Sequence, residues 1–241
     1  MKKDIKWVRS LQQKKFRTES GCFVVEGRKG VEEGFNTEQL HSVYTTDQNW
    51  SPAYASPILI TPREMEKMSS LSTPSPYLAV FYQLKSKELR ANEQTVLILD
   101  GIADPGNMGT IIRTAEWFGV NTLLCTPDCV ELYNPKVIQA TMGSIFRMNV
   151  IVLNELEMAE MLKSKEYLVI AADLRGSDIY SFDFKQRIAI VIGSESHGVR
   201  PAMRSIIDEF VTIPGAGMAE SLNASVAATI FLSENFRSNV K

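Results

Sequence analysis

Short apolar runs recur after residue 95 of this 241-residue chain, and they constrain its fold more than any other feature. The runs are continuous rather than alternating, which is typical of strands buried on both faces. Segments with a helical pattern fall between them, so we expect an α/β domain with a mostly parallel sheet covered on both faces. The expected strands are residues 96–100, 122–125, 148–153, 167–172, 188–193 and 210–214. The expected helices are residues 107–118, 134–142, 155–164, 200–208 and 221–237.

A smaller α/β unit is predicted before residue 85. Its expected helices lie near residues 4–15, 28–34 and 61–71, and its expected strands at 22–27, 42–46, 57–61 and 77–83. Thr61, Pro62 and Glu64 match a capping box with proline in the first turn, which predicts a helix start. The polar stretch that follows the unit lacks an apolar period and indicates a linker. We therefore divide the chain into residues 1–84, a linker at 85–95 and a larger domain at 96–241.

The composition is that of a globular protein with a substantial core, at 44% hydrophobic and 22% charged residues. No apolar run approaches the roughly 20 residues that span a membrane, and the lysine-rich N-terminus lacks the apolar core of a signal peptide. Three cysteines favour a reducing compartment over a disulfide framework, so we expect a cytoplasmic protein. Cys125 and Cys129 are distant in sequence from both histidines, and no metal site is predicted.

Positive charge is concentrated at the N-terminus, although the chain as a whole has a net charge of −2. Within the first 29 positions, nine lysines and arginines stand against three acidic residues. A solvated basic helix and a face that meets RNA phosphates both account for this charge. On the second interpretation the phosphate contacts are Lys14, Lys15, Arg17, Arg28 and Lys29. Trp7 or Phe16 would then stack on an unpaired base, unless both belong to the core.

Three glycine-bearing blocks follow predicted strands, at the edge of the sheet where ligands of parallel α/β proteins gather. The first block, residues 99–119, contains Asn107, which can cap the following helix. It also contains Arg113, which either extends to solvent beside apolar neighbours or acts on the ligand. The spacing of its glycines does not give G-x-G-x-x-G, which disfavours a nicotinamide or flavin cofactor.

The second block, residues 190–201, begins within the expected strand 188–193 and continues into the loop after it. Gly193 permits close approach of the backbone to a ligand. Glu195 is either a helix cap or a polar group of the site. His197 is either an exposed loop residue or a general base, since its titration range suits that role.

The third block, residues 211–231, combines a strand, a loop and the start of an apolar helix. Ser221 can cap that helix. Asn223 is expected just inside the helix, where an asparagine has no packing value. Together the three blocks predict one composite site that surrounds a compact ligand with backbone groups and small polar side chains.

The three blocks resemble the sequence motifs of the SpoU (TrmH) branch of the SPOUT RNA methyltransferases. The resemblance covers about residues 96–236. It is carried by Asn107, Gly109, Arg113-Thr114-Ala115, Gly193-Ser194-Glu195, Gly198, Ile213-Pro214, Ser221-Leu222-Asn223 and Ala227. Residues 22–33 are similar to the small ribosomal-protein-like RNA-binding domain that is often fused to these enzymes.

The resemblance implies an α/β fold with a C-terminal trefoil knot, which is an exception to the usual avoidance of threaded chains. It also implies a homodimer that binds S-adenosyl-L-methionine and methylates a ribose 2′-hydroxyl of structured RNA. The N-terminal domain favours rRNA over tRNA as the substrate. The implied cofactor residues are Gly193, Ile213 and Leu222, and the implied catalytic residues are Arg113, Asn107, Glu195, Ser221 and Asn223. Because the family assembles its site across the dimer, Arg113 would serve the cofactor of the partner.

Three other functions are compatible with parts of this sequence. A non-catalytic RNA-binding protein with the same fold is disfavoured by the complete set of motif residues. A small-molecule enzyme is disfavoured by the basic N-terminal unit. A methyltransferase that acts on an RNA base is distinguished only by the atom that receives the methyl group.

Overall fold

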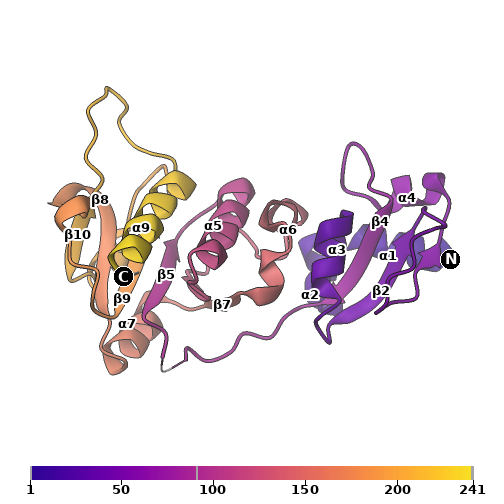
Figure 1. Ribbon diagram of the computed structural model, residues 1–241, viewed down its shortest axis with the longest axis horizontal. Helices are drawn as coiled ribbons and strands as arrows, with labels where there is room; N and C mark the ends of the chain where they lie inside the picture. The colour runs from indigo at the N-terminus through magenta and orange to yellow at the C-terminus, as the bar shows by residue number, and fades with distance from the viewer. Residues whose placement is uncertain (1, 91, 240–241) are drawn as a thin grey trace. The chain divides into compact units, whose positions relative to one another are not determined.

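The computed structural model describes residues 2–90 and 92–239. These residues form two compact units (Figure 1). The N-terminal unit holds the chain up to Lys85 together with Glu131–Phe146, and the C-terminal unit holds Ser86–Val130 and the chain from Arg147 onward. Among the described helices, none combines the length and apolar character needed to cross a membrane.

The N-terminal unit is built on a mixed four-stranded sheet in the order β1-β4-β2-β3, in which only β2 and β3 are parallel. Its strands are β1 (Cys22–Glu26), β2 (Leu40–Thr45), β3 (Ile58–Leu59) and β4 (Tyr77–Tyr82). Its helices are α1 (Lys2–Ser10), α2 (Lys14–Ser20), α3 (Arg28–Gly34), α4 (Pro62–Met68) and α6 (Pro135–Thr141), followed by the short helix η1 (Ser144–Arg147). The capping box of α4 is confirmed, because Thr61 Oγ1 accepts from the Glu64 N–H and the Glu64 carboxylate accepts from the Thr61 N–H.

The segment Glu131–Phe146 comes from the middle of the chain and completes the core of the N-terminal unit. The rings of Phe23 and Tyr133 lie 4.6 Å apart, and those of Phe81 and Phe146 lie 4.7 Å apart. Arg17 is only 3% exposed and its guanidinium forms an ion pair with Glu131. The placement of Arg17 on an RNA-facing surface is therefore corrected: its charge is neutralised inside the unit.

The C-terminal unit contains a six-stranded sheet in the order β10-β8-β9-β5-β6-β7, and all of its neighbouring strands are parallel. The strands are β5 (Thr95–Asp100), β6 (Thr122–Cys125), β7 (Asn149–Val152), β8 (Leu168–Asp178), β9 (Ile188–Gly193) and β10 (Glu209–Thr212). The predicted α/β fold with a parallel sheet is confirmed. Both faces of the central strand β5 are buried, as its continuous apolar run indicated.

The helices of this unit are α5 (Pro105–Trp117), α7 (Glu155–Ser164), α8 (Pro201–Arg204) and α9 (Ala224–Asn239), with the short helix η2 (Ile179–Ser181). Helices α5 and α9 lie side by side (Figure 1). Met158 of α7 and Met203 of α8 pack in one buried cluster with Val96 and Ile98 of β5. The loops that carry the sequence motifs all leave the same, carboxyl edge of the sheet.

Candidate active site

One polar side chain from each motif joins a continuous chain of hydrogen bonds at the carboxyl edge of the C-terminal sheet. Asn107, in the first turns of α5, donates from Nδ2 to Glu195 Oε1 in the loop after β9. Asn223, at the end of the loop after β10, donates from Nδ2 to Asn107 Oδ1 over 3.0 Å. The three blocks that the sequence separates by up to 116 positions therefore meet through side chains.

The same region shows how the two helices begin. The N-cap of α5 is Asp104, whose Oδ1 accepts from the Asn107 N–H at 2.8 Å. Asn223 precedes α9, and its Oδ1 accepts from the Ser225 N–H at 2.9 Å. The predicted caps at Asn107 and Ser221 are therefore wrong, and Asn223 lies before the helix rather than within it. An Asp followed by proline at the first helical position was the available signal for the α5 cap.

The loop after β9 is closed at its base by glycine. Ser194 and Gly198 exchange backbone hydrogen bonds of 3.2 and 2.8 Å. A Cβ at Gly193 would overlap the backbone of Gly198, so only glycine permits this crossing. Glu195 and His197 lie at the exposed tip of the loop, where the His197 ring contacts Ser196 Oγ at 2.7 Å.

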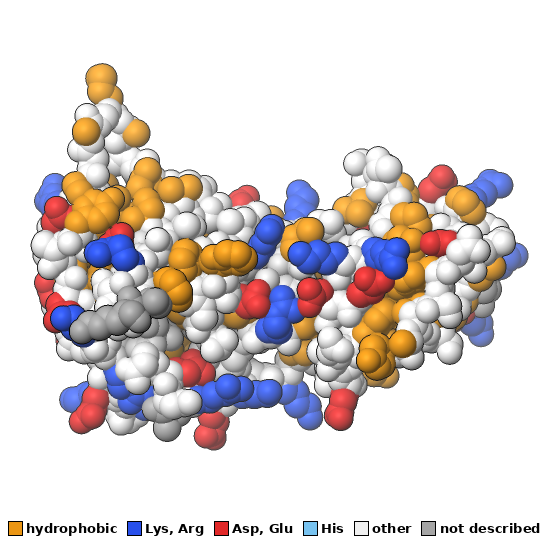
Figure 2. Space-filling model, viewed as in Figure 1, with side chains coloured by type: hydrophobic (Ala, Val, Ile, Leu, Met, Phe, Trp, Pro, Cys, Tyr) orange, Lys and Arg blue, Asp and Glu red, His pale blue; other side chains and the backbone are white. Residues whose placement is uncertain are grey.

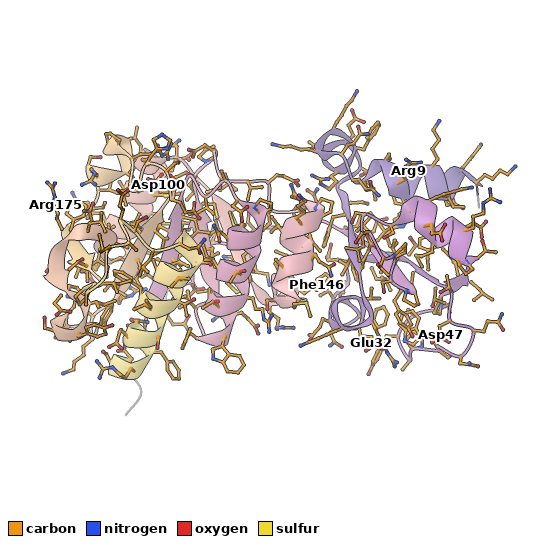
Figure 3. The ribbon with its side chains drawn as sticks, turned by 90° about the horizontal axis from the view of Figure 1, so that it is seen from above. Arg9, Glu32, Asp47, Asp100, Phe146 and Arg175 are labelled. Atoms are coloured by element: carbon orange, nitrogen blue, oxygen red, sulfur yellow. The ribbon has the colours of Figure 1, made fainter. Side chains whose placement is uncertain are left out.

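Arg200 fastens this loop to the end of β5 through a carboxylate that the sequence analysis did not single out. Its backbone N–H and its Nε donate to the fully buried Asp100 over 2.8 and 2.6 Å. Its other nitrogens pair with Asp128 at 3.0 Å and Glu155 at 2.8 Å. Burial alone would lower the pKa of Arg200, but the three carboxylates raise it above its ordinary value. Figure 3 shows Asp100 among packed side chains and Arg175 at the periphery of the same unit.

The loop after β10 offers a largely unoccupied set of backbone donors and acceptors. Within the described chain, no residue from 214 to 222 takes part in a backbone–backbone hydrogen bond. The loop projects from the unit in Figure 1 and shows hydrophobic side chains at its tip in Figure 2. Ile213 is half-buried at its start, and Leu222 is 45% exposed at its end. Ser221 is also exposed. This combination fits a compact ligand with an apolar ring and many polar atoms.

Arg113 is not part of the Asn107–Glu195–Asn223 chain. It lies six residues after Asn107 on α5, which corresponds to a rotation of about 240° around the helix axis. Its side chain is exposed and shares one helix face with Trp117, which is 81% exposed. The structure therefore places the predicted catalytic arginine on an open surface of the C-terminal unit.

Cys125 is the last residue of β6, and Cys129 follows it in the loop that lies beside the end of β5. Cys129 Sγ contacts the Leu99 carbonyl oxygen at 3.3 Å and Thr126 Oγ1 at 3.6 Å. A hydrogen bond from Cys125 lowers the pKa of Cys129 to about 7, despite partial burial of the thiol. The same hydrogen bond and full burial hold the pKa of Cys125 well above its ordinary value.

Four of the five predicted phosphate contacts in the N-terminal unit are exposed: Lys14, Lys15, Arg28 and Lys29. The last two stand at the start of α3 beside a cavity of about 220 Å³. Its remaining lining is mainly apolar and includes Ile138, Met142 and Phe146. Phe16 and Trp7 are both half-buried, so neither is a fully buried core residue.

A parallel α/β sheet whose glycine-bearing loops converge at its carboxyl edge defines a class of proteins that bind a compact ligand there. The sequence profile of the SpoU rRNA Methylase family matches residues 94–233, and that of the MRM3-like substrate binding domain matches residues 2–79. The chain belongs to the SpoU rRNA methylase family and is an RNA methyltransferase.

Similar proteins cover both units of the chain. RlmP of Bacillus subtilis, a 23S rRNA (guanosine(2553)-2′-O)-methyltransferase, is 27% identical over 230 residues, which are 93% of this chain and 92% of that protein. A TrmH-family protein structure from Porphyromonas gingivalis is 32% identical with a TM-score of 0.86, over 97% of this chain and 96% of that one. The AdoMet-bound rRNA methyltransferase of Sinorhizobium meliloti is 26% identical with a TM-score of 0.90, over 98% and 95% of the two chains.

Proposed function

We propose that this protein uses S-adenosyl-L-methionine to methylate a ribose 2′-hydroxyl in structured rRNA. The observation that carries the proposal is the hydrogen-bonded chain of Asn223, Asn107 and Glu195, which joins the three family motifs at the ligand-binding edge of the sheet. Two similar proteins support the chemistry. The B. subtilis relative is a 23S rRNA 2′-O-methyltransferase, and the S. meliloti relative was solved with AdoMet.

Gly193, Ile213 and Leu222 are the residues proposed to hold the cofactor. Ile213 and Leu222 supply the apolar surface for its adenine, and the free backbone groups of residues 214–222 supply polar partners. Gly193 acts by closing the base of the loop after β9. We further propose that the chain between β9 and α9 forms the trefoil knot implied by the family resemblance.

The proposed active form is a homodimer in which α5 meets the partner subunit. Trp117 at 81% and Phe236 at 46% exposure are apolar side chains on the adjacent helices α5 and α9, which suits a covered surface. Arg113 shares the face of Trp117, so a partner that covers Trp117 also receives Arg113. This arrangement supports a site made of Asn107, Glu195, Ser221 and Asn223 from one subunit and Arg113 from the other.

The cofactor supplies a methyl group on an electrophilic sulfonium. With the cofactor bound, the ribose oxygen would take the methyl carbon as the carbon–sulfur bond breaks and S-adenosylhomocysteine departs, and the hydroxyl proton would pass to a phosphate oxygen or water. Correct placement of the reactants can lower such a barrier by roughly 7–11 kcal/mol. A guanidinium does not lose its proton at physiological pH. We therefore assign Arg113 as a bidentate clamp on the developing alkoxide or a neighbouring phosphate.

The N-terminal unit is proposed to bind the RNA substrate. Lys14, Lys15, Arg28 and Lys29 are exposed and can contact phosphates. The proposed division is a substrate-binding domain at 1–84, a linker at 85–95 and a methyltransferase domain at 96–241, with residues 131–146 packed in the first unit. We also propose a cytoplasmic location, in keeping with the proposed rRNA substrate.

The decisive experiment offers methyl-labelled S-adenosyl-L-methionine and purified protein to separated rRNA and tRNA from a strain that lacks the gene. We expect label in rRNA, and nuclease digestion with mass spectrometry should locate it on a ribose oxygen. Label on a base, or only in tRNA, would contradict the proposal. Binding of the cofactor by calorimetry separates a wrong substrate from a non-catalytic protein, because the latter would not bind it.

A further inference from the structure

Three aromatic rings meet at the surface of the N-terminal unit, each from a different element. The ring centroids of Trp7 in α1 and His41 in β2 are 4.9 Å apart. His41 and Tyr82, at the end of β4, are 5.3 Å apart in an edge-to-face arrangement. His41 is exposed, Tyr82 is 46% exposed and Trp7 is half-buried. The three rings form a continuous aromatic surface, which we call the aromatic platform.

A β-bulge explains why His41 points outward. The register of β2 against β4 shifts between Leu40 and Ser42, so His41 has no paired residue on β4. Bulges re-aim a side chain and recur near functional sites. The buried positions of the adjacent layer are taken by other residues, among them Val8 and Leu11. His41 and Tyr82 are therefore not needed to fill the core, whereas Trp7 packs one side of its ring against that cluster.

The helices α1 and α2 are rich in exposed basic side chains. Lys3 lies one helical turn before Trp7 on α1 and on the same face. Other exposed basic residues of α1 and α2 are Lys2, Lys6, Arg9, Lys14 and Lys15. Arg9 is labelled on α1 in Figure 3. An aromatic surface beside clustered cations is the combination that single-stranded nucleic acids require, because bases stack while phosphates pair with lysine.

We propose that Trp7, His41 and Tyr82 stack on an unpaired base of the RNA substrate, while the basic residues of α1 contact the adjoining phosphates. The inference rests on the proposed function only in that the substrate is RNA. It adds a recognition element for a single-stranded loop or bulge, since bases within an A-form duplex are not available for stacking. The platform is separate from the cavity beside Arg28 and Lys29, whose lining includes none of its three rings.

The test measures binding of the full-length protein to a fluorescein-labelled 12-nucleotide oligo(A) RNA and to a 12-base-pair RNA duplex. His41→Ala and Tyr82→Leu should each weaken oligo(A) binding about tenfold, since one stacked base contributes about that factor. Duplex binding should change less than about twofold. The salt dependence of oligo(A) binding should remain as in the wild type, because the phosphate contacts are retained.

Tyr54→Ala is the matched control, because Tyr54 is a 75% exposed aromatic residue of the same unit outside the platform. Equal oligo(A) affinity of wild type, His41→Ala and Tyr82→Leu would overturn the inference. So would a loss in Tyr54→Ala as large as theirs. If His41→Ala and Tyr82→Leu keep the RNA affinity of the wild type but self-associate more weakly in sedimentation, the inference is also overturned. The platform would then bind a second copy of the chain.

Two further measurements separate this inference from the proposed function. Thermal unfolding of His41→Ala and Tyr82→Leu should match the wild type, and calorimetry should give unchanged cofactor affinity. If oligo(A) binding falls in these variants but no ribose methylation is found, the platform stands and the proposed reaction fails. If methylation is found and oligo(A) binding is unchanged, the reaction stands and the platform fails.

Discussion

At the scale of single residues, Asn223 uses the two ends of its amide differently. Its oxygen accepts from the Ser225 N–H at the start of α9, and its nitrogen donates to Asn107 over 3.0 Å. An aspartate at this position keeps the acceptor and loses the donor. The substitution Asn223→Asp therefore separates helix capping from the contact within the site.

We expect Asn223→Asp to leave the free energy of unfolding within about 1 kcal/mol of the wild type, because aspartate is as good an N-cap as asparagine. Methyl transfer should fall about tenfold to a hundredfold, the effect of one lost hydrogen bond to a polar group. Urea unfolding and single-turnover methylation are the measurements. Asn223→Ala should lose both stability and activity. Full activity in Asn223→Asp would show that the donor to Asn107 has no catalytic role.

Arg113 offers a second test at this scale. A clamp that uses two parallel N–H groups depends on the planar guanidinium, which lysine lacks. Arg113→Lys should therefore reduce the rate of methyl transfer almost as much as Arg113→Ala, with cofactor affinity retained in both. Rates would be measured under single-turnover conditions. Turnover near the wild-type value in Arg113→Lys would favour a simple positive charge over a bidentate clamp.

Cys129 provides a pH-dependent prediction. The hydrogen bond from Cys125 lowers the pKa of Cys129 in the folded state to about 7. The thiolate of Cys129 therefore stabilises the fold fully at pH values above about 8.5, which is the pKa of an ordinary thiol in the unfolded chain. That contribution falls away as the pH decreases through 7. Alkylation of Cys129, followed by peptide mapping, should be half-maximal near pH 7. Cys125→Ala should move this midpoint upward, and a midpoint that stays near 7 would contradict the assignment of Cys125 as the cause.

At the scale of elements, the loop after β9 depends on the pairing of Arg200 with Asp100. Removing Arg200 would leave a fully buried carboxylate with only a backbone N–H as its described partner. Loss of one member of a buried pair costs about 3–5 kcal/mol. Arg200→Ala should lower the free energy of unfolding by that order and weaken cofactor binding, because the loop loses its attachment to β5.

The control for this prediction is Arg237→Ala. Arg237 pairs with Glu234 on α9, but its side chain is 65% exposed. Such surface pairs contribute at most about 1 kcal/mol. Chemical unfolding of both variants checks the comparison, and equal losses in the two would show that the Asp100 pair is no more than a surface contact.

Local pattern was sufficient to predict most elements of the C-terminal sheet. Strands β6 and β9 and helix α7 have the predicted bounds, because a buried strand and a capped helix each have a signal within their own residues. The helix expected at 4–15 is two helices, α1 and α2, separated by a turn that no glycine or proline marks. Strand β8 runs to Asp178 because its pairing with β10 resumes after a register shift.

The site was predicted only in part, because some of its residues have a local sequence signal and others depend on distant partners. The motif residues could be selected by their type and their position after strands, and three of them do meet. The partners that hold them could not be selected, because the pair Arg200–Asp100 joins residues that are 100 positions apart. Arg17 illustrates the opposite error: the local run of basic residues indicated a surface position, but its distant partner Glu131 is what buries it.

At the scale of the whole molecule, the proposed sharing of the active site between two subunits predicts complementation between two inactive variants. Arg113→Ala and Asn223→Ala should each be inactive as homodimers. A heterodimer of the two contains one site with an intact Arg113 from one chain and an intact Asn223 from the other. With each chain carrying a different affinity tag, the purified heterodimer should have about half of the wild-type activity. An inactive heterodimer would place both residues in the same subunit's site.

The segment Glu131–Phe146 has a consequence for how the protein is made. The ribosome releases the N-terminal unit first, yet the residues that cover Phe23 and Phe81 are synthesised only after β5 and β6. Domains usually fold in order during synthesis, but this unit completes its core only when Phe146 has emerged. For the same reason, gene fusion could not transfer the substrate-binding unit intact as one continuous piece, because part of its interior is encoded within the methyltransferase domain.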